Sequence, residues 1–504
     1  MSRVLGAALL GVDGSAVEVE VRISSQLPRT DIVGLADAVV RESASRVRAA
    51  IASSGLAFPD RRVTVNLAPA HLRKSDPGLD LPIAVAVLAA SAQLEPDGLA
   101  GVGLVGELAL DGRIRAVRGA LALCLALRDA GCSRVVVPAG NAGEAALAPG
   151  VEVFAAPDLA SLARHLGGAE RLPLAAPPPA AAEATPCPDL GDVRGQPVAR
   201  RALEVACAGG HALLLRGAPG CGKTMLARRV PGLLPPLDFD EALEVTRIHG
   251  AAGRLSESAP LVWQRPFRAP HHTASPAGLL GGGSPPRPGE ISLAHRGVLF
   301  LDELPEFDRR CLEALRQVLE ERRIVIARAR FSCSFPAQLQ LVAAANPCPC
   351  GWRGSAARDC RCDDAAIARY ARRISGPLLD RFDLQVEMQP VAWIELDGAA
   401  TAAQSREVRD RVCAARGRQA AREGGRCRTN AEIPDAQLDA AVAATAEARA
   451  LLGRAVEKLG LSARAARRTL RVARTIADLA GDARTGAPAV AEALGYRDRI
   501  TRGA

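Results

Sequence analysis

One segment, Gly217–Thr224, limits the possible folds of this chain more than any other feature of its sequence. It matches the pattern G-x-x-x-x-G-K-[ST], follows an apolar strand (212–215) and precedes a helical segment (225–230). A glycine turn can precede a helix by chance, but a strand, a turn and a helix in this order direct backbone N–H groups at phosphate oxygens. We therefore predict a nucleotide site formed by the whole loop: Gly217, Ala218, Pro219, Gly220, Cys221, Gly222, Lys223 and Thr224.

Two carboxylates that follow a second apolar strand complement this loop. The strand Val298–Leu301 ends in Asp302 and Glu303. Lys223 is predicted to contact the β- and γ-phosphates, and the Thr224 hydroxyl and Asp302 are predicted to hold Mg²⁺. Glu303 is then placed to polarise the attacking water. Because helices often begin with a similar pattern, this prediction depends on the phosphate-binding loop upstream.

Three more polar side chains complete the predicted catalytic set. Asn346 ends a third apolar strand (341–345) and could orient the attacking water, although an amide that merely ends a strand is the simpler interpretation. Arg381 follows a short apolar helix, and Arg464 lies at the start of an amphipathic helix (461–480). A phosphoryl group in transfer needs cations, and a neighbouring subunit can supply one. A solvated or ion-paired arginine is the alternative at both positions.

The 504 residues divide into several domains. A proline- and alanine-rich stretch, 171–188, is predicted to be an extended linker. Residues 1–170 mix alternating strands with apolar helices and predict an α+β domain. Residues 189–390 carry the phosphate-binding signals and predict an α/β core. Residues 391–504 are rich in Ala, Arg and Glu and predict a helical domain.

Composition limits the location and the partners of the chain. The longest apolar run, 81–92, is too short to span a membrane and contains Pro82. Residues 3–12 loosely resemble a signal peptide, but the alternating strand at 17–23 favours the start of a domain. Thirteen cysteines, an odd number, suit reduced thiols in the cytoplasm. The net charge of +9 permits a polyanionic partner, whereas 3% aromatic residues argue against a surface built on stacked bases.

Four cysteines lie close together in the sequence and form two C-x-C pairs. Four thiolates can close a tetrahedral Zn²⁺ site, and we expect a structural zinc ion here in preference to free thiols or a redox pair. The residues are Cys348, Cys350, Cys360 and Cys362.

A predicted hairpin carries four arginines, Arg322, Arg323, Arg328 and Arg330, around the short strand 324–326. These side chains would contact DNA phosphates if the hairpin pointed into the channel of a ring, and otherwise they form a solvated surface. The neighbouring residues His271 and His272 lack partners at ligand spacing, so a metal site there is disfavoured. The glycine-rich stretch around them predicts a mobile insertion.

These motifs, in this order, resemble the AAA+ ATPases, more narrowly the magnesium-chelatase-like group and most closely the bacterial YifB/ComM family. The resemblance implies an AAA+ P-loop core with a helical lid, and ATP and Mg²⁺ as cofactors. It implies that Asn346 is sensor 1, Arg381 a trans-acting arginine finger and Arg464 the sensor 2 arginine. It also implies a homohexameric ring that acts on DNA, with branch migration during natural transformation as the associated activity. The matching stretches are Pro266–Thr273, Gly281–Gly283, Pro288–His295, Gly297–Phe307, Asn346–Gly351 and Ile374–Asp383.

The N-terminal domain resembles the catalytic domain of Lon protease, which is related to the ribosomal S5 domain 2 fold. Gly106–Arg113 and Val135–Pro138 carry this likeness. Proteolysis of this type needs a serine in a Pro-Ser-Ala-Gly turn and a nearby lysine. The chain has Pro77–Asp80 at the first place and Leu121 at the second, whereas Lys74 and Ser75 precede the expected position. We therefore expect no peptidase activity.

Two other functions remain open beside a DNA motor. One is a motor subunit that drives metal insertion into a tetrapyrrole, which would need a separate chelating partner. The other is an ATP-controlled scaffold that does not translocate. An ATP-dependent protease is disfavoured because the Ser–Lys pair is missing.

Overall fold

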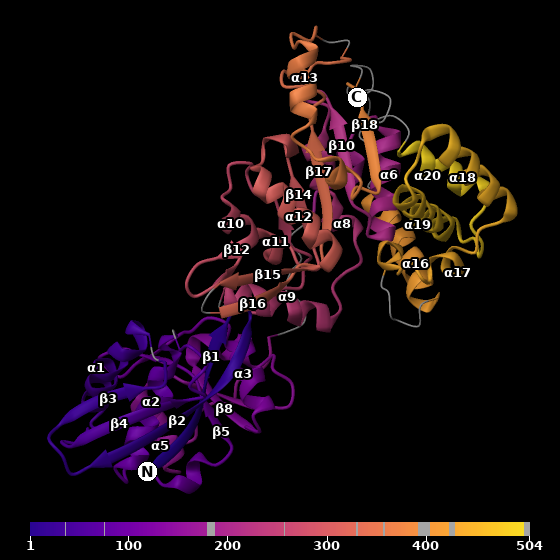
Figure 1. The fold of residues 1–504 in the computed structure, drawn as a ribbon. Helices are drawn as coiled ribbons and strands as arrows, with labels where there is room; N and C mark the ends of the chain where they lie inside the picture. The colour runs from indigo at the N-terminus through magenta and orange to yellow at the C-terminus, as the bar shows by residue number, and fades with distance from the viewer. Residues whose placement is uncertain are drawn as a thin grey trace.

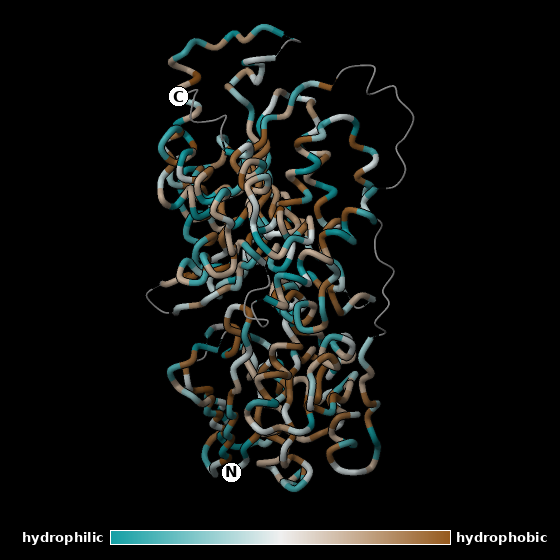
Figure 2. The backbone as a smooth tube through the Cα atoms, turned by 90° about the vertical axis from the view of Figure 1, so that its right-hand side faces the viewer, coloured by the Kyte–Doolittle hydropathy of each residue, from teal (hydrophilic) through white to brown (hydrophobic). Residues whose placement is uncertain are grey.

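The chain folds around two β-sheets with separate hydrophobic cores (Figure 1). The structure is a computed structural model that describes residues 1–35, 37–74, 76–178, 187–256, 258–328, 331–355, 358–391, 404–422 and 429–497. Figure 2 shows hydrophobic segments in the interior of both bodies. None of the described helices is long and apolar enough to cross a membrane.

The N-terminal body contains a seven-stranded sheet in the order β3-β4-β2-β1-β5-β8-β9. Its strands are β1 Ser2–Leu10, β2 Asp13–Ser24, β3 Arg29–Val33, β4 Arg62–Ala68, β5 Val102–Leu104, β8 Arg134–Pro138 and β9 Glu152–Ala156. Its α-helices are α1 Ala38–Ser53, α2 Asp80–Ala90, α3 Ala120–Asp129, α4 Ala142–Ala145 and α5 Leu159–Leu166, and a small pair consists of β6 Glu107–Leu108 and β7 Ile114–Arg115. The segment 3–12, which loosely resembles a signal peptide, thus belongs mostly to the central strand β1.

The second body is built on a five-stranded sheet in the order β11-β14-β17-β10-β18. The strands are β10 Leu213–Gly217, β11 Phe267–Arg268, β14 Val298–Leu301, β17 Gln340–Ala345 and β18 Leu384–Met388. Every neighbouring pair is parallel. The carboxyl ends of β10, β14 and β17 therefore meet at one edge, which is where open α/β sheets bind ligands.

Short helices surround this sheet. They are α6 Pro197–Gly209, α7 Lys223–Ala227, α8 Val230–Leu233, α9 Phe239–Ala251, α10 Pro276–Leu280, α11 Glu290–Leu293, α12 Arg309–Glu321, α13 Asp364–Ala371 and α14 Gly376–Leu379. Two antiparallel pairs lie outside the five-stranded sheet: β12 Gly281–Gly282 with β13 Arg287–Pro288, and β15 Arg323–Arg328 with β16 Phe331–Pro336. The predicted bounds of the helix at 225–230 are wrong, because the segment divides into α7 and α8. Pro231 has no N–H to donate to the Ala227 carbonyl, so one continuous helix is disfavoured here.

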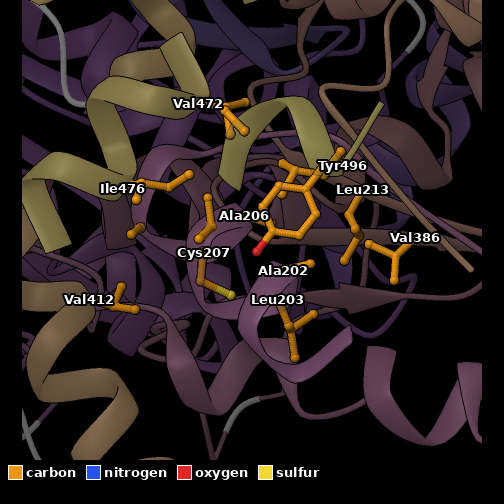
Figure 3. Packing of buried hydrophobic residues seen from close by; sticks show 14 of the residues in the cluster. Ala202, Leu203, Ala206, Cys207, Leu213, Val386, Val412, Val472, Ile476 and Tyr496 are labelled. Atoms are coloured by element: carbon orange, nitrogen blue, oxygen red, sulfur yellow. The ribbon is translucent and has the colours of Figure 1, made fainter. Parts of the chain in front are cut away.

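The C-terminal helices pack on α6 beside the sheet (Figure 1). They are α16 Ser405–Arg422, α17 Leu438–Val442, α18 Ala446–Leu459, α19 Ala463–Ala480 and α20 Ala487–Gly495. Figure 3 shows Val472 and Ile476 of α19 in one cluster with Ala206 and Cys207 of α6, together with Tyr496. We call the bundle formed by α16–α20 the lid.

The stretch expected to be a linker is partly held against the N-terminal sheet. Leu172 is buried, and Leu174 forms an antiparallel bridge with Phe154 of β9. The N–H of Ala175 donates to the Val153 carbonyl at 2.8 Å. The first part of this stretch thus extends the sheet edge, and residues 179–186 lie outside the described residues.

Apolar contacts join the two bodies where α3 meets α9. Leu121 of α3 and Val245 of α9 belong to one buried cluster. The N–H of Gly119 donates to the Gly250 carbonyl at 3.1 Å, and a Cβ atom on Gly250 would lie 2.5 Å from a carboxylate oxygen of Glu144. This close approach explains why glycine stands at position 250.

Exchanging Glu144 for Gln should stabilise the protein at alkaline pH. Burial raises the pKa of Glu144 to about 7, from an ordinary value of 4.5. Between these two pH values the folded protein keeps a proton that the unfolded chain has lost, so stability falls as pH rises. Glutamine keeps an oxygen to accept the Leu121 N–H, which donates to Glu144 at 3.2 Å, and it carries no charge.

We therefore expect the variant to unfold about 2 °C above the wild type at pH 8, with a smaller difference at pH 5. Differential scanning calorimetry across this range measures the effect. The exposed Glu152 of β9, exchanged for Gln, serves as the control. Equal pH dependence in wild type and Glu144→Gln would contradict the assignment.

Candidate nucleotide site

The loop between β10 and α7 adopts a backbone conformation that lets phosphate oxygens approach its N–H groups closely. Gly220 and Gly222 adopt φ values of +81° and +90°, which residues with a side chain rarely adopt. Lys223 is buried, and its Nζ donates to the carbonyl oxygens of Gly217 at 2.7 Å and Ala218 at 2.9 Å. The ammonium group thus lies inside the loop.

The parallel sheet brings four of the predicted residues together. Lys223 Nζ lies 3.2 Å from Asn346 Oδ1, and the Thr224 hydroxyl donates to Asp302 Oδ2 at 2.6 Å. Asn346 directly follows β17, and Asp302 directly follows β14, so both come from the same edge as the loop. A hydroxyl and a carboxylate are oxygen ligands that suit Mg²⁺, and the donor set fits a magnesium nucleotide.

Glu303 stands on a strained turn beside a histidine. Its φ of +52° is left-handed, and its N–H donates to Asp302 Oδ1 at 3.0 Å. Its carboxylate is 47% exposed and lies 3.2 Å from His272 Nδ1. The side chain is therefore open to a water molecule and oriented by the imidazole.

His272 is the functional neighbour that sequence reasoning missed. The sequence gives no reason to connect it to Glu303, 31 positions away. The strand that carries this segment to the site, β11, has only two residues and shows no periodicity.

Arg381 and Arg464 lie together at the opposite edge of the sheet. Arg381 precedes the amino end of β18, and it is 1% exposed and paired with the carboxylate of Glu320 on α12. Arg464 Nη2 lies 3.8 Å from the same Glu320 oxygen. Both arginines line a polar cavity of about 630 Å³ that contains none of the residues of the loop 217–224. Within the described part of one chain, neither arginine shares a cavity with the nucleotide loop.

Positive charge accumulates in this cavity. Burial, together with the nearby guanidinium groups of Arg464, Arg468 and Arg316, lowers the pKa of Arg381 to about 10. Arg468 of α19 donates from Nη1 to the Arg381 carbonyl and to Asp383 Oδ1, both at 2.8 Å. The lid helix is thus bonded directly to the Arg381 segment.

The four cysteines converge on one point. Their sulfur atoms all lie within 4.8 Å of one another. The N–H groups of Trp352 and Arg361 lower the pKa of the Cys350 thiol to about 6. The cysteines in the described residues are all free thiols. The residues are Cys348, Cys350, Cys360 and Cys362.

The predicted arginine hairpin is present as β15 and β16, but its arginines differ in exposure. Arg322 forms an ion pair with Glu432 at 2.7 Å and is directed to the lid region. Arg323 is exposed and lies 3.8 Å from Glu321. The side chain of Arg328 and the whole of Arg330 lie outside the described residues.

The N-terminal body holds Lys74 in a structural position. It is fully buried, burial lowers its pKa, and its Nζ donates to the carbonyl oxygens of Leu67 and Gly34 at 2.9 and 3.0 Å. Leu121 is buried in the apolar contact with α9. Ser75 lies outside the described residues.

Three family profiles match the chain. The family described as magnesium chelatase, subunit ChlI, matches residues 189–396. A second profile, subunit ChlI of Mg-chelatase, matches residues 19–141, and a third, the C-terminal part of the same subunit, matches residues 402–497. Together the three profiles account for most of the chain.

Several curated proteins match over nearly their whole length. An uncharacterized protein of Mycobacterium tuberculosis is 46% identical over 511 residues, which cover 100% of this chain and 99% of the relative. The uncharacterized protein YifB of Escherichia coli is 44% identical, with 98% and 96% covered. The competence protein ComM of Haemophilus influenzae is 42% identical, with 99% and 97% covered. The chain therefore belongs to the YifB/ComM family of magnesium-chelatase-like proteins.

Proposed function

We propose that this protein is an AAA+ ATPase that assembles into a homohexameric ring and moves branched or single-stranded DNA, as a helicase or branch-migration factor in recombination or natural transformation. The observation that carries the ATPase is the contact of Lys223 with Asn346 beside the Thr224–Asp302 pair. Family membership supports the same activity.

The nucleotide site assigns one role to each side chain. Lys223 exchanges its bonds to loop carbonyls for bonds to the β- and γ-phosphates. Thr224 and Asp302 would hold Mg²⁺, which when bound would supply positive charge to the phosphates. Glu303 accepts a proton from the attacking water once its carboxylate turns from His272. Asn346 orients that water as sensor 1.

The two arginines complete the site of a neighbouring protomer. Arg381 and Arg464 line the edge opposite their own loop, which supports a ring in which they would face the nucleotide of the next protomer. Arg381 then acts as the arginine finger and Arg464 as the sensor 2 arginine. Glu320 pairs with both arginines in the free protomer and would have to release them when the nucleotide arrives.

The N-terminal body is proposed to be a Lon-like module without peptidase activity. Lys74 is enclosed by main-chain carbonyls and so is not available as a base. The body serves as a binding or assembly unit in this proposal. A cytoplasmic location fits the free thiols of the described cysteines.

DNA as the substrate is supported by charge and by the relatives. The net charge of +9 is compatible with a polyanionic partner, the exposed Arg323 stands at the start of the β15–β16 hairpin, and the relative from Haemophilus influenzae is named a competence protein. A metal-chelatase motor is the second candidate, favoured by the descriptions of the matching profiles. It would need a separate chelating subunit and would not respond to DNA.

A four-way junction should raise ATP turnover several-fold and should be unwound by the wild type. We expect Arg323→Ala to lower the ratio of turnover with junction DNA to turnover without it, because a phosphate contact is lost. The comparable exposed Arg113 of the N-terminal body, exchanged for Ala, is the control.

Steady-state ATPase assays and gel-based junction unwinding measure these effects. If junction DNA neither binds to the protein nor changes its rate of ATP hydrolysis, the proposal of a DNA motor is wrong. An ATP-controlled scaffold or a chelatase motor would then explain the same ATPase better.

A further inference from the structure

The cysteine cluster has the dimensions of a metal site. Cys348 Sγ lies 3.4 Å from Cys350 Sγ and 3.6 Å from Cys360 Sγ, and the Cys350 and Cys360 sulfur atoms are 3.6 Å apart. A tetrahedral zinc site with Zn–S bonds of about 2.3 Å has sulfur atoms about 3.8 Å apart. The observed separations come close to that geometry.

Backbone N–H groups surround these sulfur atoms. The N–H groups of Trp352 and Arg361 point to Cys350, that of Cys362 points to Cys360, and that of Cys350 points to Cys362. Hydrogen bonds from the second shell orient the ligands of a metal and stabilise their negative charge. The loop therefore directs backbone donors at three of the four sulfur atoms, as the second shell of a metal site would.

The described part of the loop has little apolar packing. Among the described residues of 352–366, no side chain is buried. Cys348, in contrast, is fully buried. A segment without an apolar core needs a crosslink to hold one conformation, and a metal ion can supply it.

This loop also packs against the nucleotide site. Gly351 adopts a φ of +84°, and a Cβ atom there would lie 2.7 Å from Cδ of Pro219 in the phosphate-binding loop and 3.9 Å from Cγ of Asn346. The Gly351 N–H donates to the Cys348 carbonyl at 3.0 Å. Gly351, which directly follows the pair Cys348/Cys350, thus lies close to both Pro219 and Asn346.

We propose that the four thiolates bind one Zn²⁺ ion and that this ion fixes Asn346 beside Lys223, so that ATP hydrolysis depends on zinc while ATP binding does not. The binding of zinc stands independently of the ATPase. Its effect on hydrolysis rests on the proposed function.

Metal content of the purified full-length protein tests the site. We expect about one zinc ion per chain in the wild type, and less than about a tenth of that in the double variant Cys360→Ser/Cys362→Ser. Cys413→Ser, a half-buried lid cysteine outside the cluster, should retain the full content. Equal zinc in the double variant and the wild type, or none in the wild type, would overturn the site.

Reversible removal tests the coupling without a variant that could misfold. A zinc-selective chelator applied to the wild type in excess Mg²⁺ should reduce ATP hydrolysis at least tenfold and leave binding of a fluorescent ATP analogue within about twofold. Added Zn²⁺ should restore hydrolysis, and Co²⁺ should restore it with the visible absorption of a tetrathiolate site. Unchanged hydrolysis after zinc loss would overturn the coupling. Full zinc content in a protein that never hydrolyses ATP would reject the ATPase and leave the site standing.

Discussion

Exchanging Glu303 for Gln should lower the rate of ATP hydrolysis about 100- to 1000-fold and leave ATP affinity nearly unchanged. The amide matches the carboxylate in shape but cannot accept a proton from water. In the proposed site the contacts to phosphate and Mg²⁺ come from Lys223, Thr224 and Asp302, so we expect ATP binding not to require the Glu303 charge. Single-turnover hydrolysis and equilibrium binding of ATP separate the two effects.

A nearby carboxylate supplies a matched control for this result. Glu306 lies three residues beyond Glu303 and forms an ion pair with Arg373 at 2.5 Å, away from Lys223 and Thr224. Glu306→Gln should hydrolyse ATP within about twofold of the wild type. Full activity in Glu303→Gln would assign the proton acceptor to another group, and a loss of ATP binding would show that the carboxylate acts on the nucleotide.

Mixing two inactive variants should restore activity. Lys223→Ala removes the proposed phosphate contact of its own site, and Arg381→Ala removes the cation that we propose acts on a neighbour. In rings assembled from equal amounts of both, about a quarter of the interfaces pair an intact loop with an intact arginine, and we expect about a quarter of wild-type turnover. Each variant alone should show about 1% of wild-type activity or less.

The mixing experiment needs a control for stability, because Arg381 is buried against Glu320. Thermal unfolding of Arg381→Ala should precede the assay. Arg316→Ala, on the same helix as Glu320 and half-exposed, should keep turnover within about twofold. Inactive mixtures of two well-folded variants would place the action of Arg381 within its own protomer.

The nucleotide loop was predictable because its signal is local. A strand, a glycine turn and a helix start are contiguous in the sequence, and parallel pairing then brings Asp302 and Asn346 to the same edge. The amphipathic helix that carries Arg464 was also predictable from its periodicity, and it is present as α19. The cysteine cluster followed from spacing alone.

Contacts between distant segments were not predictable. His272 reaches Glu303 through a strand of two residues, and Glu320 meets Arg381 across 61 positions. Arg322 looked available for DNA but pairs with Glu432. Such pairs have no signature in a single sequence. The domain limits at 170, 188 and 390 and the likeness to Lon protease stay predictions.

The two hydrogen bonds that Arg468 donates link the lid to the segment that carries Arg381. Arg468 Nη1 donates both to the main-chain carbonyl of Arg381 and to the carboxylate of Asp383. The other carboxylate oxygen of Asp383, Oδ2, lies 3.3 Å from Nδ1 of His211, which shortly precedes β10. A shift of α19 along its axis therefore pulls the segment 381–383 with it. If the protein forms the ring proposed above, a movement of one protomer's lid would therefore reach the ATP site of its neighbour through Arg381, and this would couple hydrolysis in adjacent protomers.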